Sequence, residues 1–211
     1  MEMIPEELNQ YLLQTCEPEV ELLQRIDRET QLEVLMPRML SGHLQGRVLS
    51  MLSKMMQPQR ILEIGTFTGY ATLCLAEGLA AHGKIITLDI NEELEDRVRG
   101  YFLESGINEK IDYRIGNAVE LIPAIAEVFD IVFIDADKKN NGAYYNLVFD
   151  KVRNGGLIII DNVLWSGKVL TKNNDADTSN ILTFNEMIVA DERVEKLILP
   201  VRDGLFMVRK K

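Results

Sequence analysis

The sequence predicts an α/β fold: one doubly wound, mostly parallel seven-stranded sheet with a C-terminal antiparallel hairpin, preceded by N-terminal helices. Three observations support this prediction. Short apolar runs alternate with helix-like segments along the chain, as in repeated βα units. The runs are continuously apolar, which is typical of parallel strands that are covered on both faces. Near the carboxyl terminus, Asp203-Gly204 separates two β-rich runs, and this dipeptide favours a hairpin.

The elements follow one another without an internal repeat. Residues 5–35 and 43–57 carry apolar residues at helical spacing, and Pro37 and Gly42 mark the break between them. The strands expected before the hairpin are 60–64, 84–90, 111–115, 130–135 and 156–161. The helices expected between them are 69–81, 92–105, 118–127 and 140–152, and a last helix follows the polar loop 171–180 and runs to residue 191. No linker divides the 211 residues, so one domain is expected over 1–211.

Composition excludes several classes of protein. The formal net charge of −10 disfavours polyanion binding as the main activity, because such proteins usually carry a basic face, although a local basic patch remains compatible. No apolar run approaches the ~18 residues that indicate a membrane span, and the acidic start, MEMIPEELNQ, lacks the order of a secretory signal. Cys16 and Cys74 form neither a disulfide framework nor a zinc motif. We therefore expect reduced thiols, no membrane contact and a cytoplasmic location.

A glycine turn, EIGTFTGYA, follows the first predicted strand. Gly65 and Gly69 permit a tight strand-to-helix turn and a close approach of the backbone to a ligand. A dinucleotide fingerprint would place glycines at 65, 67 and 70, but Phe67 and Tyr70 stand there, and Phe67 would crowd a pyrophosphate. Glu63 would repel a polyphosphate, whereas it suits a ligand that carries an ammonium or a sulfonium. The alternative is a structural turn that binds nothing.

Two later strand ends complete a nucleoside site. Asp89 closes the second predicted strand and is placed to accept both hydroxyls of a ribose, although it could also be a solvated carboxylate that caps the next helix. Gly116-Asn117-Ala118 would bring backbone donors close to a flat base at the end of the third strand. A nucleoside with a positively charged, non-phosphate tail fits these positions together, and S-adenosylmethionine is such a molecule.

Carboxylates end the next two strands. The runs FDIVFIDADKKN and GGLIIIDNVLW lead into Asp135 and into the pair Asp161-Asn162. The two strands are expected to be neighbours, roughly 5 Å apart, so these side chains would converge as three oxygen ligands. Oxygen ligation suits Mg²⁺, or Mn²⁺ or Ca²⁺, rather than zinc. Each acid taken alone could instead cap a helix or face water.

Such a metal would leave about three octahedral positions open, of which two could take a bidentate substrate such as an ortho-diphenol. Lys138 lies close enough in sequence to remove a proton from a hydroxyl held there, and a lysine beside a divalent cation is suited to act as a base near neutral pH. Trp165, and Tyr144 or Tyr145, are candidate walls for the substrate's aromatic ring. Ordinary packing under a loop is the alternative for Trp165.

These motifs together resemble the metal-dependent class I O-methyltransferases of the catechol and caffeoyl-CoA type. The resemblance covers residues 30–211 and rests on LEIGTFTGYA, LDIN, GNA, FIDADKKN, DNVLW and LPVRDGLFMVRK. It implies Lys138 as the catalytic base and Asp135, Asp161 and Asn162 as metal ligands. The positions expected to contact the cofactor are Ser41, Glu63, Gly65, Gly69, Tyr70, Ala71, Asp89, Gly116, Ala118 and Asp135. Lys138 and Trp165 are expected to contact the substrate.

The resemblance also implies a Rossmann-like methyltransferase domain, a homodimer, and an N-terminal helical extension, residues 1–57, that covers the active site. Two departures concern the cofactor contacts: Ala71 stands where a serine usually binds the cofactor carboxylate, with Thr72 as the possible substitute, and Ala118 offers only its backbone. The leading hypothesis is methylation of a catechol-like or hydroxycinnamoyl small molecule. Methylation of a tRNA hydroxyl is the first alternative. A nicotinamide-dependent oxidoreductase or a non-catalytic nucleotide-binding domain is the second.

Overall fold

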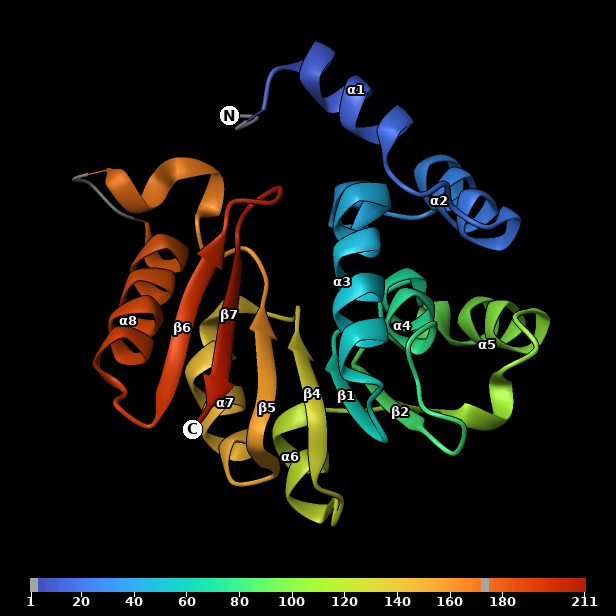
Figure 1. The fold of residues 1–211 in the computed structure, drawn as a ribbon. Coiled ribbons are helices and arrows are strands. Elements are labelled where there is room, and N and C mark those ends of the chain that lie inside the picture. Colours follow the sequence, from blue (N-terminus) through green and yellow to red (C-terminus); the bar gives the residue numbers. More distant parts are fainter. Residues whose placement is uncertain (1–3, 172–174) are drawn as a thin grey trace.

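A computed structural model describes residues 4–171 and 175–211 of the chain. Its centre is a sheet of seven strands: β1 (Arg60–Ile64), β2 (Lys84–Asp89), β3 (Ile111–Ile115), β4 (Phe129–Ile134), β5 (Val152–Ile160), β6 (Val194–Leu199) and β7 (Leu205–Lys210). They lie in the order β3-β2-β1-β4-β5-β7-β6 (Figure 1). The first five are parallel, and β7 pairs antiparallel with both β5 and β6. The predicted fold class is therefore confirmed, including the closing hairpin.

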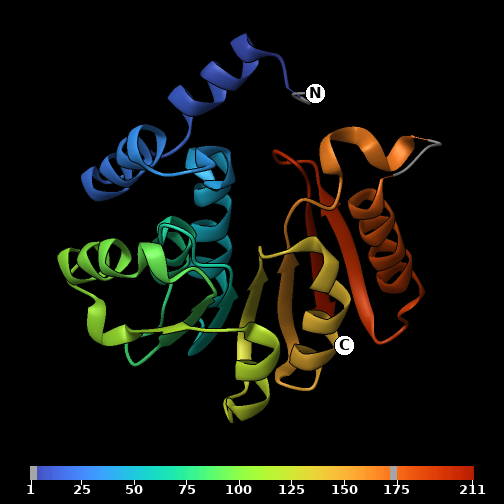
Figure 2. The same ribbon diagram turned by 180° about the vertical axis from the view of Figure 1, so that it is seen from behind.

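Helices cover both faces of this sheet. The helices of the described chain are α1 (Glu6–Thr15), α2 (Glu21–Glu33), α3 (Gly42–Met56), α4 (Tyr70–Ala76), α5 (Glu95–Glu104), α6 (Ala118–Ala124), α7 (Asn141–Phe149) and α8 (Ala176–Ala190). Single 3₁₀ turns lie at Pro37–Met39, Glu92–Leu94, Asn108–Lys110 and Lys138–Asn140, and a longer one at Trp165–Leu170. Figures 1 and 2 show α3, α4 and α5 on one face and α6, α7 and α8 on the other. Among the described residues, no helix combines the length and apolar character that a membrane span requires.

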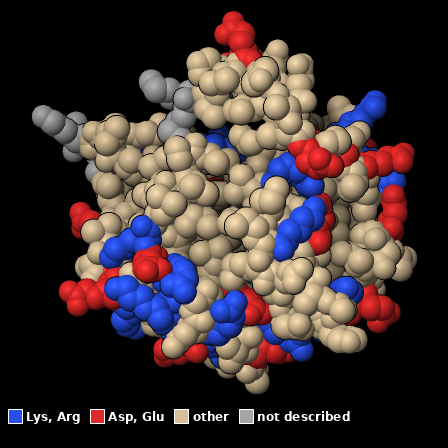
Figure 3. All heavy atoms as spheres, viewed as in Figure 1, with Lys and Arg blue, Asp and Glu red and all other residues tan. Residues whose placement is uncertain are grey.

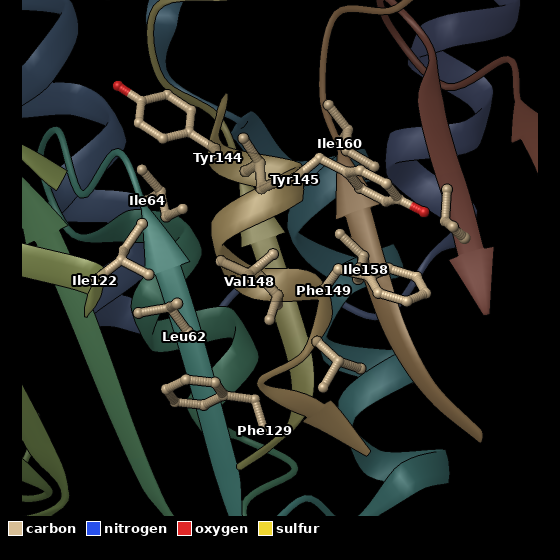
Figure 4. Close-up of a cluster of buried hydrophobic side chains, with 14 of the residues drawn as sticks. Leu62, Ile64, Ile122, Phe129, Tyr144, Tyr145, Val148, Phe149, Ile158 and Ile160 are labelled. Atoms are coloured by element: carbon tan, nitrogen blue, oxygen red, sulfur yellow. The ribbon is translucent and has the colours of Figure 1, made fainter. Parts of the chain in front are cut away.

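Two hydrophobic layers result from this arrangement. Ile61 of β1 points into the layer that α2 to α5 cover, whereas Leu62, the next residue, points into the layer beneath α6 to α8. Both side chains are fully buried. Figure 4 shows the second layer, in which Val148 and Phe149 of α7 pack near Ile158 of β5. Burial on both faces explains why the strands are continuously apolar instead of alternating.

The helix boundaries differ from those expected at several places; the helix expected at 69–81, for example, ends at Ala76. The segment 5–35 forms two helices, α1 and α2, which are separated at Cys16–Val20. The predicted helix 118–127 ends at Ala124, one residue after Pro123. The predicted loop 171–180 includes the start of α8, because Asp175 caps that helix and accepts a hydrogen bond from Thr178 N at 2.8 Å. Residues 172–174 of that loop lie outside the described part of the chain.

The N-terminal helices are attached to the sheet to different degrees. In Figures 1 and 2, α1 lies beyond the carboxyl ends of the parallel strands, and it has no buried residue. By contrast, α2 buries Leu23 and Ile26 in the layer that contains α4 and α5. The third helix, α3, reaches the end of β5 with a side chain, Gln45, as described below.

Candidate active site

The carboxyl ends of the central strands are level with one another. Ile64 of β1 is in register with Ile134 of β4, and Ile134 is in register with Ile160 of β5. The residues that follow, Gly65, Asp135 and Asp161, therefore leave the sheet at one height. The hydrogen bonds continue across this edge, since Asp135 N donates to Ile64 O at 2.8 Å and Asp161 N donates to Ile134 O at 3.0 Å. The predicted adjacency of strands four and five is confirmed.

Asp161 is held rigidly at the end of β5. Its side chain is buried, with 3% of the residue exposed. One carboxylate oxygen accepts from Asn162 N at 2.6 Å, and the other accepts from Gln45 Nε2 of α3, also at 2.6 Å. Burial raises the pKa of Asp161 to about 7, and the negative charge of Asp135 contributes to that rise. The two carboxylates are therefore close enough to repel each other.

Asp135 is the more exposed of the two carboxylates, and the ammonium group of Lys138 lies beside it. Lys138, in the 3₁₀ turn after β4, places Nζ 3.0 Å from Asp135 Oδ1. The turn lets the chain fold back so that the lysine, three residues further on, faces the strand end. Sequence spacing predicted this proximity, and the structure brings the two side chains together.

The donor set at this edge fits a hard divalent cation. Asp135 and Asp161 supply carboxylate oxygens, and Asn162, whose φ is +63° and whose backbone N–H donates to Asp161, is the next residue in the chain and carries an amide. Burial is the main cause of the raised pKa of Asp161, and a cation between the two carboxylates would offset the additional rise that comes from repulsion by Asp135. Within residues 4–171 and 175–211, no three His, Cys, Asp or Glu side chains form a metal-binding cluster.

Glu63 lies beneath the glycine turn and is fully buried. Its Oε2 accepts hydrogen bonds from the hydroxyls of Thr72 and Thr87, the latter at 2.6 Å. Burial raises the pKa of Glu63 to about 8. Its Oε1 has no hydrogen-bond partner among the described residues. A cationic group placed near this carboxyl would favour its ionised form. This agrees with the expectation that Glu63 suits a ligand that carries an ammonium or a sulfonium.

Both glycines of the turn are required by geometry. Gly65 has a φ of +102°, and a Cβ there would lie 2.0 Å from the carbonyl oxygen of Asp135. Gly69 has a φ of +78°, and a Cβ there would lie 2.6 Å from the ring of Phe102. These close approaches explain the glycines without a ligand, so they do not by themselves establish a binding site. They do bring the turn against the strand end that carries Asp135.

Asp89 joins the glycine turn to the end of β2. Phe67 N donates to its Oδ2 at 2.6 Å, and Asn91 N donates to its Oδ1 at 2.8 Å. Asn91 in turn caps the following turn by accepting from Glu93 N at 3.0 Å. Each oxygen of Asp89 keeps a second lone pair, which is the acceptor capacity that a ribose diol needs.

The remaining predicted cofactor positions lie either at the end of β3 or at the starts of α3 and α4. Gly116, which donates its N–H to Asp89 O at 2.7 Å, lies at the same edge of the sheet and leads into Ala118 at the start of α6. Ser41 and Ala71 are buried at the starts of α3 and α4, respectively. The side chain of Tyr70 lies between α3 and α4, where its hydroxyl donates to Glu19. Tyr70 can therefore offer a ligand only its backbone.

The aromatic candidates occupy different environments. The hydroxyl of Tyr145 donates to Asp191 at 2.9 Å, and its ring packs with Phe149 and Phe184, so it belongs to the core and not to the site. Tyr144 donates to Asp137 Oδ1 at 2.5 Å, in the loop that also carries Lys138. Trp165 has a buried indole nitrogen without a hydrogen-bond partner in the described part of the chain. Trp165 and Tyr144 therefore remain the candidates for a substrate wall.

Sequence reasoning did not identify three polar residues near these strand ends. Gln45 contacts Asp161 from α3, and Asp137 accepts from both Tyr144 and Asn140. Arg202, at the tip of the β6–β7 hairpin, donates to the carbonyl oxygens of Leu40 and Ser41. Asp137 could have been found, because it lies within the quoted FIDADKKN motif. The other two lie at least 116 residues from their partners, and no local pattern marks them.

Comparison with known proteins agrees with this geometry. The model of the O-methyltransferase family matches residues 14–211. A caffeoyl-CoA O-methyltransferase of Mesembryanthemum crystallinum is 37% identical over 180 residues, which are 79% of this chain and 70% of the relative. Caffeoyl-CoA O-methyltransferase 1 of Eucalyptus globulus is 36% identical over 179 residues, with coverages of 79% and 72%.

Solved structures show the same fold along nearly the whole chain. An O-methyltransferase from Bacillus cereus, in complex with SAH, superposes with a TM-score of 0.89 at 32% identity, covering 97% of each chain. The O-methyltransferase TomG from Streptomyces achromogenes, in complex with SAM, gives a TM-score of 0.90 at 25% identity, covering 99% of this chain and 100% of TomG.

The doubly wound sheet with its closing hairpin, and the polar residues at its strand ends, define a class I methyltransferase. The chain belongs to the O-methyltransferase family and is an S-adenosylmethionine-dependent O-methyltransferase of the caffeoyl-CoA type.

Proposed function

We propose that the protein methylates one hydroxyl of a vicinal aromatic diol, catechol-like or hydroxycinnamoyl, with S-adenosylmethionine as donor and Mg²⁺, or Mn²⁺ or Ca²⁺, as the metal. One observation carries this proposal: Asp135 and Asp161 leave adjacent strands at one height, with Lys138 Nζ 3.0 Å from the first of them. This arrangement puts two oxygen donors and a basic side chain within reach of one small molecule. The proposal also rests on the caffeoyl-CoA O-methyltransferases that the chain resembles.

The donor would lie across the ends of β1, β2 and β3. The donor, S-adenosylmethionine, carries the methyl group that is transferred on a positively charged sulfur. Glu63 offers a carboxyl whose ionised form a cation would stabilise, and Asp89 offers two acceptor oxygens for a ribose diol. Gly65 and Gly116 would allow the donor close to the backbone, while Ala118 would lie against the base. The hydroxyl of Thr72 donates to Glu63. Thr72 would have to release that hydrogen bond before it could bind the cofactor carboxylate in place of the serine that is absent at Ala71.

The metal would be held by Asp135, Asp161 and Asn162. Bound there, it would supply Lewis acidity to two vicinal oxygens of the acceptor. Lys138 would leave its ion pair with Asp135, release one ammonium proton to solvent, and then accept the proton of the reacting hydroxyl at its neutral Nζ. Trp165 and Tyr144 would enclose the aromatic ring and exclude water, so that the chain's main contribution is alignment.

The small-molecule acceptor is favoured over a tRNA hydroxyl by the surface charge. On the face that Figure 3 shows, the densest group of Lys and Arg lies over the lower half of β6 and β7, and smaller groups lie elsewhere on this face. Arg209, near the C-terminal end of β7, is paired with Glu195 at 2.8 Å. An RNA substrate would need unpaired cations around the strand ends.

The assembly and the location also belong to this proposal. We place a homodimer contact on the outer face of α3, where Met51 and Met55, one helical turn apart, are 59% and 75% exposed. We infer a cytoplasmic location, because Cys16 and Cys74 are both free thiols.

Two measurements test the activity. Calorimetric titration with S-adenosylmethionine and with NAD in parallel should show binding of the first, and preference for NAD would overturn the methyltransferase reaction. A panel of vicinal diphenols, coenzyme A thioesters and undermodified tRNA should then show methylation of the first two kinds with Mg²⁺ and little with a chelator. Methylation of tRNA alone would replace the small-molecule proposal with the alternative.

A single substitution, Asp161→Ala, tests the proposed metal ligands. Asp161→Ala removes a carboxylate from the proposed set, so activity should respond far less to added Mg²⁺ than in the unmodified enzyme. A full Mg²⁺ response in Asp161→Ala would show that the cation binds elsewhere.

A further inference from the structure

Gln45 has a buried side-chain amide that donates its hydrogen bond to Asp161, at the candidate site. It lies in the first turn of α3 and is 0% exposed. Its Nε2 donates to Asp161 Oδ2 at 2.6 Å, over a separation of 116 residues. Its Oε1 is buried and has no hydrogen-bond partner among the residues that the structure describes. A buried amide left half-paired is costly, which raises the question of what this residue does.

The bond to Asp161 determines how the carboxylate is oriented. One oxygen of Asp161 is fixed by the backbone N–H of Asn162, and the other is fixed by Gln45. Two donors on two different oxygens stop the carboxylate from rotating about its last bond. Each oxygen then keeps a lone pair in a defined direction, as a metal ligand needs.

We propose that Gln45 is a positioning residue: it orients Asp161 for the divalent cation and thereby couples the docking of α3 to metal affinity. This inference rests on the proposed function, because it presupposes the metal at Asp135, Asp161 and Asn162. The free Oε1 of Gln45 would accept a hydrogen bond from a water molecule or a hydroxyl that enters with the cation.

The coupling follows from where the two residues lie in the chain. Asp161 ends β5, in the sheet, whereas Gln45 belongs to the helix that follows the N-terminal segment. Arg202 fixes the entry to this helix by donating to the carbonyls of Leu40 and Ser41. Metal binding at the strand ends therefore depends on a helix being seated correctly, and outer partners of ligands typically change affinity about 10- to 100-fold.

The test is titration of the purified, ligand-free protein with Mn²⁺, followed by calorimetry or by the electron spin resonance of free Mn²⁺. Gln45→Met keeps the length and apolar volume but removes the donor, so the Mn²⁺ dissociation constant should rise about 10- to 100-fold. Ser53→Ala is the matched control: Ser53 is on the same helix, is also 0% exposed, and donates to Leu75 O at 2.6 Å instead. Its Mn²⁺ affinity should equal that of the unmodified protein.

The outcomes separate the two proposals. Equal Mn²⁺ affinity in Gln45→Met and the unmodified protein would overturn the role of Gln45 and leave the metal site standing. No Mn²⁺ binding in the unmodified protein would overturn both. A weakening of the same size in Ser53→Ala would show a general effect of disturbing α3, which also contradicts the proposal. Should Gln45→Met not fold, Gln45→Asn keeps an amide but is too short to reach Asp161, and the same loss of affinity is expected.

Discussion

At the scale of the residue, Lys138 carries the most specific prediction. Lys138→Ala removes the proposed base and the ion pair with Asp135, so turnover should fall about 10²- to 10⁴-fold, the usual range for loss of a general base. Affinity for S-adenosylmethionine should stay nearly unchanged, because Glu63 and Asp89 lie on other strands. Initial rates and calorimetric titration of the donor check the two halves separately.

The adjacent lysine supplies the control for this prediction. Lys139 is exposed, lies in the same 3₁₀ turn, and carries the same charge. Lys139→Ala should therefore keep its turnover. If both variants lost turnover equally, the effect would come from the charge of the loop, and Lys138 would lose its assigned role.

Glu63 gives a prediction about pH. Burial raises its pKa in the folded protein to about 8 from 4.5, so between these two values the folded state holds a proton that the unfolded chain has released. The contribution of Glu63 to stability is complete below pH 4.5 and is lost as the pH rises through 8. Glu63→Gln is neutral at every pH, so the ligand-free variant should lose less stability than the unmodified protein across this window, by up to a few kcal/mol.

Urea unfolding at the two ends of the window measures this difference. Glu127→Gln, at an exposed position, is the control and should follow the unmodified protein. Parallel stability curves for Glu63→Gln and the unmodified protein would mean that the carboxyl of Glu63 is ionised in the folded state, contrary to the prediction.

At the scale of the element, the β6–β7 hairpin holds the segment that precedes α3. Arg202 donates to the carbonyl oxygens of Leu40 and Ser41, and to that of Arg38 at 3.2 Å. Arg202→Ala removes all three bonds, so amide hydrogen exchange should accelerate at 38–46, and stability should fall by about 1 kcal/mol. Arg209→Ala, on the same hairpin but paired with Glu195, should leave exchange at 38–46 unchanged. Equal acceleration in both variants would contradict the proposal that Arg202 holds the segment before α3.

The elements also show which parts of the fold and site the sequence can predict. The strands and the neighbouring carboxylates were predictable, because runs such as Ile131–Ile134 are apolar on both faces and end abruptly in Asp135. The contacts of Gln45 and Arg202 were not predictable, since an amide on a helix and an arginine in a hairpin have no characteristic spacing to their partners. The sequence also did not distinguish the two adjacent tyrosines: both are buried in the same core layer, but the hydroxyl of Tyr144 reaches Asp137 in the loop of Lys138, whereas that of Tyr145 donates to Asp191.

At the scale of the whole molecule, the sheet brings together residues from both ends of the chain. Gln45 comes from the N-terminal part, the ligands of the proposed metal come from the middle, and Arg202 comes from the C-terminal hairpin. The candidate site therefore exists only in the complete fold. One helix, α3, carries both the proposed support of the metal site, Gln45, and the proposed surface for a second copy, Met51 and Met55.

The homodimer is the last prediction. Met51 and Met55 present flexible apolar side chains to solvent on α3, and a second copy would bury them. Sedimentation should find the unmodified protein dimeric at micromolar concentration, and the double variant Met51→Glu, Met55→Glu monomeric, because pairing would bury four carboxylates. Leu103→Glu changes a side chain that is 71% exposed on α5 and should leave the dimer intact. A monomeric unmodified protein would refute the dimer, and a dimer that survives the double substitution would place the contact on another face.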